Sequence, residues 1–110
     1  MPTLVWIDRS HARLYGFSRN PPTEDSLQNT MPGHGHFLEA LANRLEEATR
    51  ILIVGPGVSK YRFYAYVRET APQIARKVVG CENLEHPHDF LLRSLAEKHL
   101  GVVPNTPGVC

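Results

Sequence analysis

The sequence of 110 residues lacks the features that mark several large classes of protein. No segment reaches the length of about 20 apolar residues that a transmembrane helix needs. The opening stretch, MPTLVWIDRS, has neither the basic head nor the long apolar run of a signal peptide. The only two cysteines form no CxxC pattern. These absences predict a cytoplasmic protein with free thiols and no membrane contact.

An excess of one charge is also missing. The chain has 12 Lys and Arg against 11 Asp and Glu, whereas nucleic-acid-binding domains usually carry a clear basic surplus. The hydrophobic share, 42%, is ordinary and suffices for one core in a chain of this length. We therefore expect a single domain over residues 1–102, followed by a loosely ordered tail at 103–110.

The first third of the chain predicts a β-hairpin and a loop. Residues 3–8 are almost all apolar, residues 11–18 alternate, and a short polar turn separates them. Residues 19–35 hold three prolines and two glycines, which predicts a long loop with a short strand near residues 26–30.

The remainder predicts alternating helices and strands. Apolar residues recur at helical spacing over residues 36–50 and 58–70, and an unbroken apolar run at 51–55 indicates a buried strand between them. A last strand at 75–83 and a helix starting near His86 follow. The order β-β-α-β-α-β-α predicts a mixed sheet with helices on both faces.

Several short motifs together resemble a known family. The opening hairpin carries an Asp after its first strand and Ala-Arg in its second, and the later turns GPG and HP follow apolar strands. These segments resemble the small bacterial proteins known as translational machinery components. That family is similar to the third domain of the class-one translation termination factor of eukaryotes and archaea, and of its relative Pelota. The matching positions are Asp8, Ala12, Arg13, Gly55, Pro56, Gly57, Lys60, Val78, Val79, Gly80, Glu82, His86, Pro87 and Asp89.

The resemblance implies a three-layer α/β/α sandwich like that of the kink-turn-binding ribosomal proteins. It also implies a translation-associated binding module that needs no cofactor and contacts a protein or a ribosome-associated partner. In the termination factors, peptide release belongs to another domain with a GGQ motif, and this sequence has no GGQ. The resemblance therefore favours a non-catalytic role.

The turn after the central apolar run is the first candidate site. Its spacing fits neither a Walker loop nor a dinucleotide-binding fingerprint. Exposed N–H groups at a helix start, with a lysine one turn later, could still bind an anion. The candidate anion-binding residues are Gly55, Gly57, Ser59 and Lys60. The alternative is a tight turn in which glycine permits close packing.

The helix that follows this turn combines basic and aromatic residues. An exposed aromatic side chain on a basic helix suits contact with a partner protein, which makes Arg62, Phe63, Tyr66 and Arg68 candidates. The same surface could instead form a homodimer, bind RNA phosphate or be a solvated helix face.

Two His-x-His pairs stand at predicted helix starts. They are His34 with His36 and His86 with His88, and Asp89 follows the second pair. Imidazoles and a carboxylate are zinc ligands, so a meeting of the two pairs would suit a metal-dependent hydrolase. The spacing matches no named zinc motif, and capping or surface histidines are the alternative. The sequence thus favours a binding module over a hydrolase or an RNA-binding protein.

Overall fold

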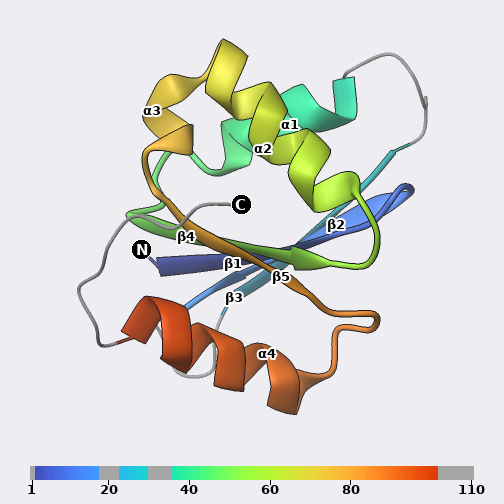
Figure 1. The fold of residues 1–110 in the computed structure, drawn as a ribbon, viewed down its shortest axis with the longest axis vertical. Helices are drawn as coiled ribbons and strands as arrows, with labels where there is room; N and C mark the ends of the chain where they lie inside the picture. Colours follow the sequence, from blue (N-terminus) through green and yellow to red (C-terminus); the bar gives the residue numbers. More distant parts are fainter. Residues whose placement is uncertain (1, 18–22, 30–35, 102–110) are drawn as a thin grey trace.

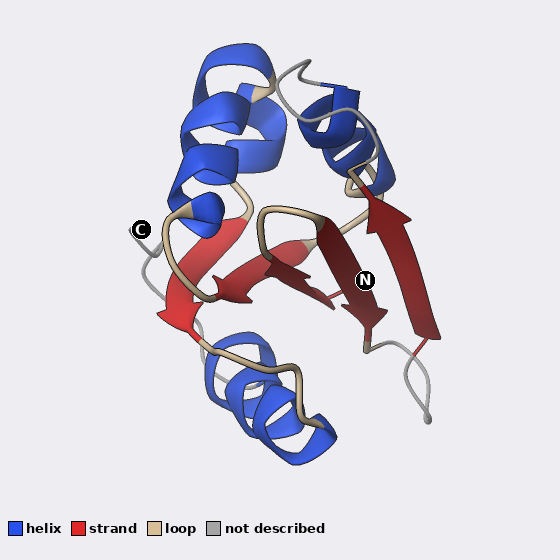
Figure 2. Ribbon diagram, turned by 90° about the vertical axis from the view of Figure 1, so that its right-hand side faces the viewer, coloured by secondary structure: helices blue, strands red, loops and turns tan. Residues whose placement is uncertain are grey.

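The computed structural model describes residues 2–17, 23–29 and 36–101. These residues form a five-stranded mixed sheet with helices packed on it. Helices α1, α2 and α3 cover one face of the sheet and α4 covers the other (Figure 1, Figure 2). This arrangement confirms the predicted α/β sandwich. The elements are β1 (Pro2–Ile7), β2 (His11–Gly16), β3 (Thr23–Gln28), α1 (His36–Arg44), β4 (Arg50–Gly55), α2 (Ser59–Thr70), α3 (Pro72–Ala75), β5 (Val78–Asn83), α4 (Asp89–Ala96) and the π-helical segment η1 (Glu97–Gly101).

The sheet has the strand order β3-β2-β1-β4-β5, with β1 at its centre. Strands β1, β4 and β5 are parallel, and β2 and β3 continue the sheet as an antiparallel meander. Because parallel strands end at the same side, Asp8, Pro56 and Leu84 follow β1, β4 and β5 at one margin. We call this margin the carboxyl edge.

The strand β4 explains why the core divides in two. Its residues alternate between the faces of the sheet, as the pleat requires. Ile51 and Ile53 pack with the helices α1, α2 and α3, whereas Leu52 and Val54 pack with α4. All four side chains are fully buried, which accounts for an apolar run without alternation in the sequence.

The edge strand β3 differs from the sequence-based expectation. The loop predicted over residues 19–35, with a short strand near 26–30, contains instead a strand of six residues that pairs along the whole of β2. Five of the six residues are exposed, so the strand carries almost no hydrophobic signal. Only Leu27 packs against the core, and the ion pair between Asp25 and Arg44 ties the strand to α1.

The helices on the α2 side also differ in detail. Helix α1 ends at Arg44 rather than near residue 50, because N–H groups then bond to carbonyls three residues back, as from Ala48 to Leu45. A short helix, α3, begins at Pro72, where a missing N–H costs nothing. The observed order therefore contains one strand and one short helix more than the predicted β-β-α-β-α-β-α.

The last helix changes type at its end. Its α-helical part stops at Ala96 and continues as the π-helical η1. The carbonyl of Leu100 accepts a hydrogen bond of 3.4 Å from Arg50, and His99 lies 3.0 Å from the Glu82 carboxylate on β5. These contacts attach η1 to the sheet.

The predicted tail at 103–110 and most of the predicted loop lie outside the described residues. Cys81, on β5, is half-buried and disulfide-bonded, so the prediction of a free thiol at this position is wrong. Cys110 is not among the described residues. None of the helices within the described ranges has both the length and the apolar character needed to cross a bilayer.

Candidate functional site

The turn after β4 lies at the carboxyl edge and depends on its two glycines. A Cβ atom at Gly55 would stand 2.1 Å from the carbonyl oxygen of Ile7, so the backbones of β4 and β1 approach too closely for any side chain. Gly55 and Gly57 both have positive φ angles, 148° and 63°. Nothing lies within 4 Å of a Cβ at Gly57, so only its backbone conformation favours glycine there.

The Lys60 side chain folds back under this turn and bonds to its carbonyl groups. This side chain is fully buried, and its ammonium group donates hydrogen bonds of 3.0 Å to the Gly55 carbonyl and 2.5 Å to the Gly57 carbonyl. The ammonium also lies 4.6 Å from the centre of the Tyr61 ring, in cation–π geometry. Burial removes water from the ammonium and lowers the pKa of Lys60.

These contacts bear on the predicted anion site. The Lys60 ammonium is bonded to two carbonyls of its own turn, so an anion would have to compete with them. Gly55 is buried, Ser59 is half-buried and Gly57 is exposed. The geometry favours the tight-turn alternative for Lys60, and anion binding by the other three residues stays a prediction.

Helix α2 turns one side to the sheet and the other to the surface. Lys60, Phe63 and Val67 recur at helical spacing and are buried against the sheet. Phe63 has no exposed surface, so its prediction as a partner-binding residue is wrong: its place in the helical period makes it part of the core. Tyr66 is half-buried and packs against the same core.

The outer side of α2 retains the two predicted arginines. Arg62 and Arg68 are exposed, and the guanidinium of Arg68 lies 5.7 Å from the centre of the Tyr64 ring. Tyr61, which is not among the predicted partner-binding residues, is 44% exposed on this side. We define the outer face of α2 as Tyr61, Arg62, Ala65, Arg68 and Glu69, all of which are exposed.

The described histidines of the two predicted pairs lie on opposite faces of the sheet. His36 begins α1 on one face of the sheet, whereas His86 and His88 lie in the loop that leads into α4 on the other (Figure 1). The rings of His86 and His88 meet edge to face with their centres 6.5 Å apart.

Across residues 2–17, 23–29 and 36–101 no three His, Cys, Asp or Glu side chains are grouped so that they could hold a metal ion. His34 lies outside the described residues, as does the side chain of Asp89. A metal site that includes these two residues therefore stays a prediction.

The hairpin turn supplies a second polar feature at the carboxyl edge. One Asp8 carboxylate oxygen accepts hydrogen bonds of 2.8 Å from the N–H groups of Ser10 and His11, and it lies 3.2 Å from the His11 Nδ1 atom. The His11 ring lies 5.2 Å from that of Trp6, centre to centre. His11 is not among the predicted site residues, although an Asp opening a short polar turn is a recognisable signal.

We compared the sequence and the fold of this chain with those of known proteins. No protein-family model and no curated protein matches the chain. Among solved structures, Archaeoglobus fulgidus Pelota matches 90% of the chain with a TM-score of 0.72 and 14% sequence identity. The fold is Pelota-like.

A second solved structure agrees with the first. Thermoplasma acidophilum Pelota matches 90% of the chain with a TM-score of 0.64 and 16% identity. The matches cover only 31% and 32% of these two Pelota chains, so the protein corresponds to about a third of their length. The comparison confirms the expected resemblance to a Pelota domain in fold.

Proposed function

We propose that this protein is a small, non-catalytic, translation-associated binding module that acts through contacts with a protein or the ribosome. The observation that supports the proposal is the Pelota-like fold, which extends over 90% of the chain at a TM-score of 0.72. Because fold alone does not determine function, the proposal needs a surface through which the contact is made.

The outer face of α2 is the surface that we propose for this contact. Helix α2 lies beside α1 and α3 over one face of the sheet (Figure 1), so the side of α2 that faces away from the sheet is at the surface. The exposed ring of Tyr61 and the guanidinium groups of Arg62 and Arg68 combine apolar area with positive charge. Tyrosine and arginine are enriched at the energetic centres of protein interfaces. The small side chain of Ala65 lies between them and leaves room for a partner.

The charge of this face specifies the partner further. Neither Arg62 nor Arg68 forms an ion pair with any other described residue. A partner segment with acidic side chains would pair with both arginines and would be guided to this face by the same charges. We therefore propose a protein partner with an acidic surface.

Co-sedimentation with purified ribosomes tests the proposal. The unmodified chain should co-sediment at about 50 and about 200 mM salt with only the modest loss that screening of two arginine pairs causes, whereas contact with many RNA phosphates would weaken far more steeply over that interval. The double variant R62E/R68E should lose at least about tenfold in binding, because it reverses both charges of the face. A matched variant, R9E, changes an exposed arginine of the hairpin turn and should bind normally.

The other possible results of the co-sedimentation experiment contradict the proposal or assign the surface to another partner. Absence of co-sedimentation at either salt concentration contradicts the proposed contact with the ribosome. A steep loss with salt assigns the face to RNA phosphate instead of protein. Binding that R62E/R68E leaves unchanged places the contact elsewhere, and a loss of dimer in the same variant, measured by size-exclusion chromatography, assigns the face to self-association.

A further inference from the structure

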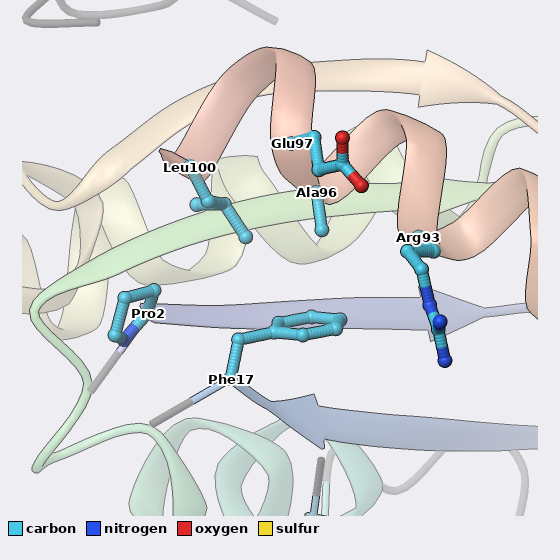
Figure 3. A pocket seen from close by; sticks show the side chains of 6 residues that line it. All are labelled: Pro2, Phe17, Arg93, Ala96, Glu97 and Leu100. Carbon is cyan, nitrogen blue, oxygen red and sulfur yellow. The ribbon is translucent and has the colours of Figure 1, made fainter. Parts of the chain in front are cut away.

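A cavity opens between the last helix and the sheet, on the face opposite to α2. It has a volume of about 250 Å³ and lies where β1 begins and β2 ends (Figure 3). Helix α4 and the segment η1 form its other wall. The lining residues are Pro2, Phe17, Arg93, Ala96, Glu97 and Leu100.

The interior of this cavity is apolar. Leu100 and Ala96 are buried in the α4-side core, and the half-buried ring of Phe17 packs against the same core. The Phe17 N–H bonds to the Pro2 carbonyl at 2.9 Å, which fixes the two strand ends that form the floor. An apolar group that entered the cavity would therefore contact a floor already held in place.

The positive side chains at the rim of the cavity lie closer to its interior than the negative one. In Figure 3 the Arg93 side chain extends from the helix down toward the level of the Phe17 ring, whereas the Glu97 carboxylate stays at the level of the helix, nearer the rim. Arg50 donates to the Leu100 carbonyl at 3.4 Å and so brings a second positive charge close to the lining. The rim therefore favours a negative group next to the apolar interior.

The volume indicates which part of a ligand the cavity can enclose. Pockets that hold whole drug-sized ligands and cofactors are about 300–1,000 Å³, and this cavity is smaller. A single ring with a short chain fits within it, and any further part of a ligand would lie outside.

We propose that the cavity binds a small carboxylate whose apolar body is the size of one aromatic ring. The ring packs against Phe17 and Leu100, and the carboxylate pairs with the Arg93 guanidinium, which can offer two parallel N–H donors. The site lies on the opposite face of the sheet from α2, so it goes beyond the proposed binding role and does not depend on it (Figure 1).

NMR titration of the full ¹⁵N-labelled chain tests the proposal with 3-phenylpropanoate as the probe. We expect saturable shifts of the amides around Phe17, Ala96 and Leu100. The neutral 3-phenylpropanamide should bind about fivefold more weakly, since exposed ion pairs contribute modestly. Shifts that do not saturate, or that arise elsewhere, overturn the proposal.

Two variants separate the contributions of charge and shape. R93Q should weaken the carboxylate about fivefold and leave the amide unchanged. The control R68Q removes an exposed arginine of α2 and should alter neither. The variant A96L places a larger side chain at the cavity and should abolish binding of both probes. If A96L does not fold, the affinity of R93Q for 3-phenylpropanoate is the decisive measurement. Equal affinity of R93Q and the unmodified chain for this carboxylate refutes the role of Arg93.

A further titration distinguishes the source of the ligand. The peptide acetyl-Phe-Asp-amide presents the same ring and carboxylate as part of a polypeptide, and acetyl-Phe-Asn-amide is its neutral control. Tighter binding of the Asp peptide than of 3-phenylpropanoate identifies an acidic peptide segment as the source. The reverse order identifies a free small acid. If neither acid binds better than its neutral control, the proposed recognition of a carboxylate is wrong.

Discussion

Replacing Lys60 by methionine tests how the buried ammonium stabilises the turn after β4. Two hydrogen bonds from a charged donor contribute about 3–6 kcal/mol in total before other effects are counted. Part of this hydrogen-bond free energy is retained in K60M. The Gly55 carbonyl still accepts a hydrogen bond of 3.2 Å from the Leu84 N–H, and the carbonyl of the exposed Gly57 can bond to water. Burying the ammonium also costs several kcal/mol, a cost that methionine avoids. We expect K60M to lower the unfolding free energy by about 1–2 kcal/mol.

Alanine at the same position separates packing from hydrogen bonding. It removes three more buried methylene groups, at about 0.8 kcal/mol each. K60A should therefore be about 3–4.5 kcal/mol less stable than the unmodified protein. Urea denaturation followed by circular dichroism measures both variants. The matched variant R62M alters the exposed neighbour and should change stability by less than about 0.5 kcal/mol.

The dependence on pH provides an independent test. Because burial lowers the Lys60 pKa below its ordinary value of 10.5, the unfolded chain binds this proton more strongly than the folded one. The cost of the buried charge is thus fully present below the folded pKa and disappears as the pH rises toward 10.5. The unfolding free energy of the unmodified protein should therefore exceed that of K60M by a margin that grows with pH between the folded pKa and 10.5. An advantage that is absent at pH 7, or that declines with rising pH, would show that the reasoning is wrong.

Two further predictions concern the carboxyl edge. G55A should cost more than about 3 kcal/mol because its Cβ would meet the Ile7 carbonyl at 2.1 Å, whereas G57A should cost only about 1 kcal/mol for its positive φ. Thermal unfolding compares them, and equal losses would contradict the close approach. D8A should cost about 1–2 kcal/mol, since it removes the acceptor for two N–H groups of the turn and the neighbour of His11. An unchanged melting temperature for D8A would refute this contribution.

The sequence predicts the central strands and the main helices because hydrophobic patterning determines both. The apolar run at 51–55 becomes β4, and helical spacing over 58–70 becomes α2. The edge strand β3 is less visible, because it is mostly exposed and gains its hydrogen bonds from β2 rather than from burial. Its pairing with β2 depends on residues that are not neighbours in the sequence.

The candidate site was harder to predict for a similar reason. A helix full of aromatic and basic residues does not reveal which of them face the sheet. Phe63 is apolar and belongs to the core, but Lys60 occupies a core position as well, because two carbonyls of the preceding turn satisfy its ammonium. Tertiary contacts of this kind cannot be read from composition. His36 and the pair of His86 and His88 illustrate the same limit, since only the topology places α1 and α4 on opposite faces of the sheet.

The hydrogen bond between Trp6 and the loop before α4 gives the protein an optical reporter of its own. The chain has a single tryptophan, and its indole is 3% exposed and donates to the Leu84 carbonyl at 3.1 Å. Indole emission moves to longer wavelength when water reaches the ring. Intrinsic fluorescence therefore follows the α4 side of the sheet selectively. A change confined to the outer face of α2 would leave the emission maximum unchanged, and release of α4 would shift it to the red.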